Sequence, residues 1–155
     1  MKIAISTDEY THLIGFLREE LRHRGHAIMY FGPERAGESA DWPDVTLEAV
    51  SAVKSGQVEE AIVFCWTGTG CSIAANKVPG IRAALCHDAE TAKGARIWNH
   101  ANVLALSLRT TSETILKEIL DAWFGTSYSE DTWNTEQIKK LEAIETQVSN
   151  QSRLD

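Results

Sequence analysis

The sequence predicts an α/β protein, a three-layer α/β/α sandwich built on a five-stranded, parallel, Rossmann-like sheet with a C-terminal helix. Two observations support this fold class. Short apolar segments alternate along the chain with segments of helical periodicity, as in folds made of strand–helix–strand units with right-handed crossovers. The apolar segments are mostly continuous, which is typical of strands that are buried on both faces.

Each expected element follows from a local pattern. The predicted strands cover residues 3–5, 27–31, 61–64, 81–85 and 102–106. The predicted helices cover residues 11–24, 44–55, 71–77, 88–98, 111–124 and 135–147. Gly25 suits the end of the first helix. Pro43 and Asp44 suit the start of the second helix, and Asp88 suits the cap of the fourth.

The bulk properties argue against several classes of protein. With 155 residues the chain fits one domain, predicted over residues 1–147 and followed by a flexible polar tail at 148–155. No apolar run approaches the ~18 residues of a membrane span. The net charge of −7 argues against binding along nucleic acid, although a local anion site needs only a few cations and N–H groups. Three cysteines without metal-ligand spacing favour free thiols in the cytoplasm.

The most informative segment is residues 64–77, where a buried strand ends at Cys65 and a glycine-containing turn leads into a helix near Cys71. Gly68 and Gly70 are expected to adopt positive φ and to let a ligand approach the backbone. Such a turn aims N–H groups at one point, which suits a phosphate or an oxyanion. On spacing alone, a merely structural turn is the alternative. The segment is neither a Walker A loop nor a GxGxxG motif.

The position of Cys65 favours chemistry at this turn. A thiol at a strand end that faces amide dipoles should have a lowered pKa, and its thiolate is a competent base or nucleophile. Core packing is the usual role of a lone cysteine in a sheet, and it is the default interpretation for Cys71 and Cys86. Because ligands of such folds bind beyond the carboxyl ends of the strands, residues 6–9, 65–70, 86–88 and 107–109 should form one rim.

The run Cys-x-Thr-Gly-x-Gly-x-Ser-Ile-Ala-Ala-Asn-Lys, from Cys65 to Lys77, strongly resembles the ribose-5-phosphate isomerase B and galactose-6-phosphate isomerase family. Further matches are Gly80-Ile81-Arg82-Ala83, Thr91-Ala92 and Asn99-x-x-Asn102-Val103-Leu104. The resemblance implies an aldose–ketose isomerase that acts on a sugar phosphate through a cis-enediolate, without a metal or an organic cofactor. It also implies a homodimer or a dimer of dimers whose active sites are shared between protomers.

The resemblance assigns roles to individual residues. Cys65 would move a proton between C1 and C2, with Thr67 as a second residue of the reaction. The backbone amides that would hold the enediolate oxygen are those of Trp66, Thr67, Gly68, Thr69, Gly70 and Cys71. The other residues that it places against the substrate are Asp8 and Trp42 at the sugar, Asn99 beside the reacting carbons and Arg109 near the phosphate.

The sequence departs from the family at the residues for ring opening. Glu9 stands where a histidine follows the aspartate of the N-terminal motif, and Trp66 replaces a glycine. Trp98 replaces the histidine that opens the sugar ring. His100 is a candidate substitute acid or base because its ordinary pKa lies near neutrality, with a structural or surface role as the alternative. Trp66 and Trp98 could stack on a sugar face or fill space.

The residues for phosphate recognition also differ. Near the C-terminus, Gln137, Lys139 and Lys140 stand where the family often has a histidine and paired arginines. Lys139 is expected to bind phosphate as a point charge. His87, at the functional rim, is a further candidate for contact with substrate. Some relatives have a glutamate as the base at the position of Cys71, so this chain has thiols at both positions.

These changes shift the expected substrate away from ribose 5-phosphate. A tetrose or tetrulose phosphate has no stable ring and needs no ring-opening residue, whereas another pentose phosphate, a hexose phosphate or a free sugar is also compatible. The main alternative function is a non-catalytic sugar-phosphate-binding or regulatory module on the same fold, which would not need Cys65. A receiver-like domain would need an aspartate where Cys65 stands.

Overall fold

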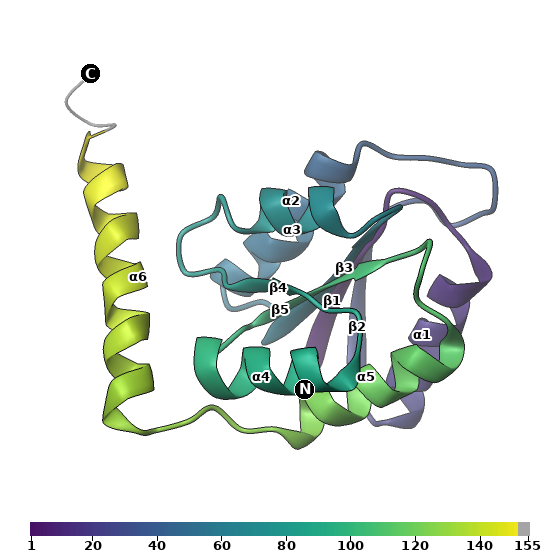
Figure 1. The fold of residues 1–155 in the computed structure, drawn as a ribbon. Coiled ribbons are helices and arrows are strands. Elements are labelled where there is room, and N and C mark those ends of the chain that lie inside the picture. The colour runs from purple at the N-terminus through teal and green to yellow at the C-terminus, as the bar shows by residue number, and fades with distance from the viewer. Residues whose placement is uncertain (152–155) are drawn as a thin grey trace.

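The computed structural model of the chain describes residues 1–151, and the side chains of residues 1–147. Five parallel strands form one sheet in the order β2-β1-β3-β5-β4 (Figure 1). The strands are β1 (Lys2–Ser6), β2 (Ala27–Phe31), β3 (Glu60–Cys65), β4 (Ala83–Leu85) and β5 (Val103–Ser107). The predicted fold class is confirmed.

Helices cover both faces of the sheet. The helices are α1 (His12–His23), α2 (Trp42–Lys54), α3 (Thr69–Ala75), α4 (Ala89–Asn99), α5 (Glu113–Gly125) and α6 (Thr132–Gln151). Figure 1 shows α2 and α3 on one face and α1, α4 and α5 on the other, while α6 stands beside the sheet. No helix in the described part of the chain is long and apolar enough to cross a membrane.

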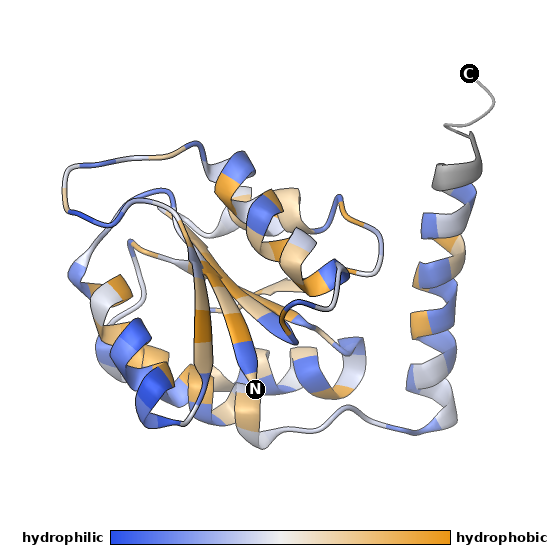
Figure 2. Cartoon of the chain, turned by 180° about the vertical axis from the view of Figure 1, so that it is seen from behind, coloured by the Kyte–Doolittle hydropathy of each residue, from blue (hydrophilic) through white to orange (hydrophobic). Residues whose placement is uncertain are grey.

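The strands are mostly apolar because successive side chains enter different cores. Ile3 and Ile5 of β1 pack with α1, α4 and α5, whereas Ala4 between them packs with α2 and α3. Figure 2 shows this apolar centre between the polar outer faces of the helices. The core that contains α3 is lined largely by small side chains such as Ala61 and Ala105, and it also holds Cys65.

Most boundaries lie one or two residues from the prediction, and three of the differences have a clear local cause. Helix α3 begins at Thr69, two residues before its predicted start, because the N–H of Ser72 already bonds to the carbonyl oxygen of Gly68 at 3.2 Å. Strand β4 starts at Ala83 because the N–H of Arg82 donates to the side chain of Asn102. The third difference is at the C-terminus.

Helix α6 is longer at both ends than the predicted helix at 135–147. It begins at Thr132 because the Asp131 carboxylate accepts a hydrogen bond from the N–H of Asn134 at 2.9 Å, which caps the helix. Residues 148–151, which the sequence assigned to a flexible tail, continue α6. The remaining residues of that tail, 152–155, lie outside the described residues.

Candidate active site

Several of the predicted site residues lie at the carboxyl ends of β1 and β3, where a sheet of this topology forms its ligand crevice. From β1, the chain places β2 on one side and β3 on the other, so the strand order changes direction between β1 and β3. Ligands of doubly wound sheets bind at such a switch point. Asp8 follows β1 there, and Cys65 ends β3.

Cys65 is the most reactive group of this crevice, although it is only 5% exposed. The pKa of its thiol is lowered from 9.0 to about 5, chiefly by a hydrogen bond from the Cys71 thiol. Backbone N–H groups of Cys71, Gly68 and Thr67 lower it further, against the opposing effect of burial. The expected direction of the shift is confirmed, and it favours the thiolate form of Cys65 at neutral pH.

The turn after Cys65 requires a glycine at position 68. Gly68 has a φ of 76°, and a Cβ there would lie 2.6 Å from Leu85 Cδ1 and 2.9 Å from the carbonyl carbon of Leu106. Neither the backbone conformation nor the space admits another residue. The tight turn brings the following N–H groups back to the sulfur of Cys65, as the sequence predicted.

Gly70 has a different role from the predicted one. It is the second residue of α3 and does not adopt positive φ, so that expectation is wrong. A Cβ at Gly70 would lie 3.2 Å from two ring atoms of Trp42, at the first turn of α2. The glycine therefore leaves room for the Trp42 indole to lie against the loop, which places this predicted sugar contact at the crevice.

Asp8 supplies a carboxyl group beside Cys65. Its Oδ1 is buried and has no hydrogen-bond partner within the described residues. The pKa of Asp8 is raised from 3.8 to about 6, first by burial, then by the charge of the Cys65 thiolate and, more weakly, by the charge of exposed Glu9. A buried carboxylate oxygen without a donor is a place for a ligand hydroxyl.

A pocket of about 520 Å³ adjoins the loop and is lined by Thr67, His87, Ser107, Arg109 and Thr110. The structure thus brings together Thr67, His87 and Arg109, three of the predicted site residues. A guanidinium, an imidazole and several hydroxyl groups suit a phosphate. Ser107 and Thr110 were not predicted as site residues. Their position directly after a buried strand is the signal that could have identified them.

Backbone contacts hold the loop against the end of β5. The carbonyl oxygen of Trp66 accepts hydrogen bonds from Ser107 Oγ at 2.9 Å and from the N–H of Arg109 at 3.0 Å. The two hydroxyl oxygens of Thr67 and Thr69 lie 2.7 Å apart. The side chain of Trp66 is left at the surface, with 49% of the residue exposed.

Three of the other predicted site residues lie at the edge of the sheet where the strands begin, opposite the edge that holds Cys65. Trp98 and Asn99 end α4, and His100 caps it, just before β5 begins. Strand β5 then runs to the edge where Cys65 lies. Its five residues span four rises of ~3.3 Å, which separates His100 from Cys65 by about 13 Å or more. Lys139 lies on α6, in an ion pair with Glu136 at 2.8 Å. One chain does not bring these residues to Cys65.

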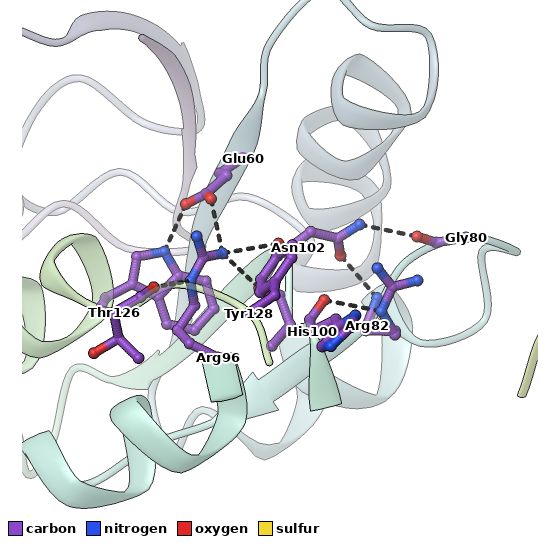
Figure 3. A network of polar contacts seen from close by, with 10 residues as sticks. Glu60, Gly80, Arg82, Arg96, His100, Asn102, Thr126 and Tyr128 are labelled. Atoms are coloured by element: carbon purple, nitrogen blue, oxygen red, sulfur yellow. Dashed lines mark hydrogen bonds and ion pairs between the residues drawn. The ribbon is translucent and has the colours of Figure 1, made fainter. Parts of the chain in front are cut away.

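A buried ionic network fixes this second edge (Figure 3). Arg96 of α4 pairs with Glu60 at 2.7 Å and donates to the carbonyl oxygen of Ala101 at 2.7 Å. Trp123 Nε1–H donates to the same carboxylate at 2.6 Å. The guanidinium of Arg96 also lies over the ring of Tyr128. These contacts tie the end of α4 to the start of β3 and to the segment after α5.

His100 is part of the same framework. It has a φ of 48°, and its carbonyl oxygen accepts a hydrogen bond from Arg82 Nε at 2.9 Å. Its ring stacks on Tyr128, with centroids 4.8 Å apart, and its Nε2 lies 2.8 Å from the carbonyl oxygen of Ser129. These contacts favour the structural alternative for His100, whose predicted role as an acid or base stays a prediction.

The side chains at the crevice suit acid–base chemistry. Throughout residues 1–151, no three histidine, cysteine or carboxylate side chains come together in a way that could hold a metal ion. All three cysteines are free thiols. A low-pKa thiolate, converging amides, a partnerless carboxylate oxygen and a cationic pocket suit proton transfer on a small anionic, hydroxylated substrate.

Comparisons with known proteins agree with this chemistry. A family model described as Ribose/Galactose Isomerase matches residues 3–141. The chain is 34% identical to the D-erythrulose-4-phosphate isomerase of Pectobacterium atrosepticum over 97% of this chain and 99% of that protein. It is 38% identical to the ribose-5-phosphate isomerase B of Escherichia coli, over 71% and 73% of the two chains. The solved ribose-5-phosphate isomerase B of Clostridium thermocellum matches with a TM-score of 0.90 at 38% identity, over 96% of this chain and 99% of that chain.

The chain therefore belongs to the ribose/galactose isomerase family, as the run from Cys65 to Lys77 indicated. It is an isomerase of the aldose–ketose type, and its relatives are named as isomerases of sugar phosphates. The alternative of a non-catalytic binding module is not favoured by these relatives.

The charge of the Cys65 thiolate should be measurable at Asp8. In a Cys65→Ser variant the thiolate is absent, so the pKa of Asp8 should fall from about 6. It should stay above 3.8, because burial is the larger cause of the shift and is unchanged. NMR titration of the Asp8 carboxyl carbon, assigned with Asp8→Asn, measures the change. Cys86→Ser, in the other core, should leave the titration as it is. An unaltered pKa in Cys65→Ser would contradict the account.

Proposed function

We propose that this enzyme interconverts an aldose phosphate and its ketose isomer, with Cys65 as the base that moves a proton between C1 and C2. The single observation that supports this most strongly is the thiolate of Cys65, held among backbone N–H groups at the end of β3. A base must be unprotonated at the working pH, and a pKa of about 5 meets that condition.

The loop would stabilise the charge that develops on the substrate. When Cys65 removes the proton next to the carbonyl group, negative charge moves to the oxygen of a cis-enediolate. The first N–H groups of α3, those of Thr69 and Gly70 among them, have no acceptor within the helix and are the proposed donors to this oxygen. The Cys65 thiol then returns the proton to the neighbouring carbon, while the hydroxyl proton of the enediolate moves from one oxygen to the other, so that the carbonyl group changes carbon.

Asp8 and the adjoining pocket would bind the two ends of the substrate. The buried Oδ1 of Asp8 needs a donor, which a sugar hydroxyl supplies. Arg109 and His87 in the adjoining pocket would hold the phosphate, together with the hydroxyl groups of Thr67 and Thr110. This arrangement fixes the carbonyl end at Cys65 and the anionic end at Arg109.

The proposed substrate is a four-carbon sugar phosphate, erythrulose 4-phosphate or its aldose isomer. Trp98 stands where relatives of this family carry a ring-opening histidine, and an indole N–H can donate but cannot accept a proton. A tetrose phosphate needs no ring opening. Trp42, which lies against the loop at Gly70, and Trp66 would narrow the crevice. A relative named for D-erythrulose 4-phosphate matches the chain almost from end to end.

The active site is proposed to be shared between two copies of the chain in the cytoplasm. Asn99 and Lys139 cannot reach Cys65 in the same chain, whereas the partner's second edge could present them. Helix α6 exposes Trp133, Leu141 and Ile144, apolar surface that one chain leaves uncovered. Leu141 and Ile144 also line a pocket of about 420 Å³ together with Asn99.

Substrate preference and the role of Cys65 can be tested together. We expect the highest kcat/KM on erythrulose 4-phosphate or erythrose 4-phosphate, above ribose 5-phosphate and allose 6-phosphate, with NMR following each conversion. Cys65→Ser should lower kcat by ~10²-fold or more, the scale of general base catalysis. His100→Ala should affect only substrates that form a ring. The substrate assignment fails if ribose 5-phosphate is converted best and His100→Ala leaves that conversion unaffected, and full turnover in Cys65→Ser removes the proposed base.

A shared site should be restored by mixing two inactive variants. Hybrid dimers of Cys65→Ser with Asn99→Ala contain one site with both lesions and one intact site, so activity should return on coexpression. The matched control pairs Cys65→Ser with Asp8→Asn, which lie at the same edge and leave a lesion in each site. Isolated hybrids of the first pair that are no more active than their parents would place the site within one chain.

A further inference from the structure

Gly94 lies in the interior of α4, where a glycine destabilises the helix relative to an alanine because it loses more conformational freedom on folding. A Cβ at this position would lie 2.8 Å from Cζ3, 3.1 Å from Cε3 and 3.7 Å from Cη2 of Trp98. These ring atoms are its nearest neighbours apart from the adjoining residues and the backbone of α4. Gly94 therefore leaves room for the indole of Trp98, one turn further along the helix.

Trp98 lies against its own helix and still faces outward. Helical side chains point towards the N-terminus of their helix, which is the direction of Gly94. The benzene part of the indole lies over the backbone there, and Gly94 is buried although the adjacent Lys93 is exposed. Nevertheless, 57% of Trp98 remains exposed. The ring is thus held on one side by α4 and has a large free surface on the other.

The position of Trp98 in the fold relates this free surface to the substrate. Trp98 directly precedes Asn99, the residue expected beside the reacting carbons, and both end α4. The same end of the helix is fixed by Arg96, which pairs with Glu60 at 2.7 Å and donates to the carbonyl oxygen of Ala101. In the proposed dimer, this end of α4 meets the crevice of the partner copy. A rigidly supported aromatic surface is then present beside the substrate.

The edge of the sheet that holds Cys65 repeats the arrangement. Trp42 lies against Gly70, where a Cβ would be 3.2 Å from two atoms of the indole, and 40% of Trp42 is exposed. Each of these two tryptophans therefore lies on a helical glycine and keeps a free surface. In a site that two copies share, one such ring comes from each copy.

We propose that Gly94 and Trp98 form a specificity-determining pair, in which the glycine keeps the indole back against α4 and the outer side of the indole forms an apolar wall of the partner copy's crevice. Ligand sites are commonly lined in this way by aromatic side chains beside a few polar groups. An indole occupies more space than the imidazole found here in the family, so the wall accepts a four-carbon sugar phosphate and excludes longer ones. This inference rests on the proposed function and names the residues that set the length of its substrate.

Gly94 matters because the wall must stand at one distance from the substrate. A Cβ cannot remain 2.8 Å from Cζ3, so in Gly94→Ala the ring moves away from α4 and into the crevice. Because the ring is exposed, it can move without disturbing the core, and an alanine suits the helix, so the variant should fold. The displaced ring takes up space that the four-carbon substrate uses.

A double-mutant cycle on kcat/KM tests the pair, with erythrulose 4-phosphate and ribulose 5-phosphate as substrates. Neither ketose closes a ring, because the phosphate occupies its terminal oxygen, so the comparison isolates chain length from ring opening. Gly94→Ala should lower kcat/KM on the four-carbon substrate by about fivefold or more, within the range of coupling between residues in contact. The loss should lie mainly in KM, because Cys65 is untouched.

Trp98→Ala removes the wall, so the preference for four carbons over five should fall by a similar factor. In the double variant, Gly94→Ala should add nothing to Trp98→Ala. The matched control is Gly125→Ala at the end of α5, where a Cβ would meet nothing within 4 Å, and it should leave both activities unchanged. The inference is overturned if Gly94→Ala has no effect, if its effect persists without Trp98, or if Trp98→Ala keeps the preference of the wild type.

The position of the ring can also be observed without turnover. In protein labelled with 7-fluorotryptophan, the ¹⁹F NMR resonance of Trp98 is assigned by its loss in Trp98→Phe. It should shift in Gly94→Ala, and it should shift in the wild type when erythronate 4-phosphate, a four-carbon acid that cannot isomerise, is added. A shift with this acid in a protein that converts no sugar phosphate would support the wall and reject the proposed reaction. An active enzyme whose Trp98 resonance ignores the acid would keep the reaction and overturn the wall.

Discussion

The site depends on a negatively charged sulfur, that of Cys65, which is almost completely buried. Burial alone would keep Cys65 neutral, and the thiolate exists because hydrogen-bond donors face it from one short segment of chain. That segment can turn back on the sulfur only because Gly68 adopts a left-handed conformation against β5. The same donors suit an enediolate oxygen, so the structure that makes the base also stabilises the charge that the base creates.

The opposite edge of the sheet is built for rigidity. Arg96, Glu60, Trp123 and Tyr128 form a buried cluster in which the charges of Arg96 and Glu60 pair with each other. The cluster holds the end of α4, where Asn99 and His100 stand. Asn99 is proposed to contact a substrate that another copy of the chain holds. Rigid support suits that role, because a small displacement of a catalytic site residue lowers the reaction rate strongly.

The sequence was informative where local chemistry decides the structure. Continuous apolar strands indicated the sheet, and the thiol followed by Gly68 indicated the turn and its lowered pKa, both of which depend on residues adjacent in the chain. Gly70 was misread because its reason lies in the Trp42 ring from a distant helix, which no local pattern reveals. Asn99 and Lys139 are far from Cys65 because of the topology of the chain, which no local pattern shows. The start of α6 depends on the Asp131 cap rather than on periodicity.

The central claim is that proton transfer between C1 and C2 passes through the Cys65 sulfur. Isomerisation in D₂O, followed by NMR of the product, tests it most directly, because a thiol proton exchanges with solvent whereas a hydride shift carries the substrate's own hydrogen. The account predicts deuterium bound to carbon at the position that receives the proton. In Cys65→Ser the rate of deuterium incorporation should fall together with the rate of isomerisation. Complete retention of the original hydrogen in product and in unreacted substrate would contradict it.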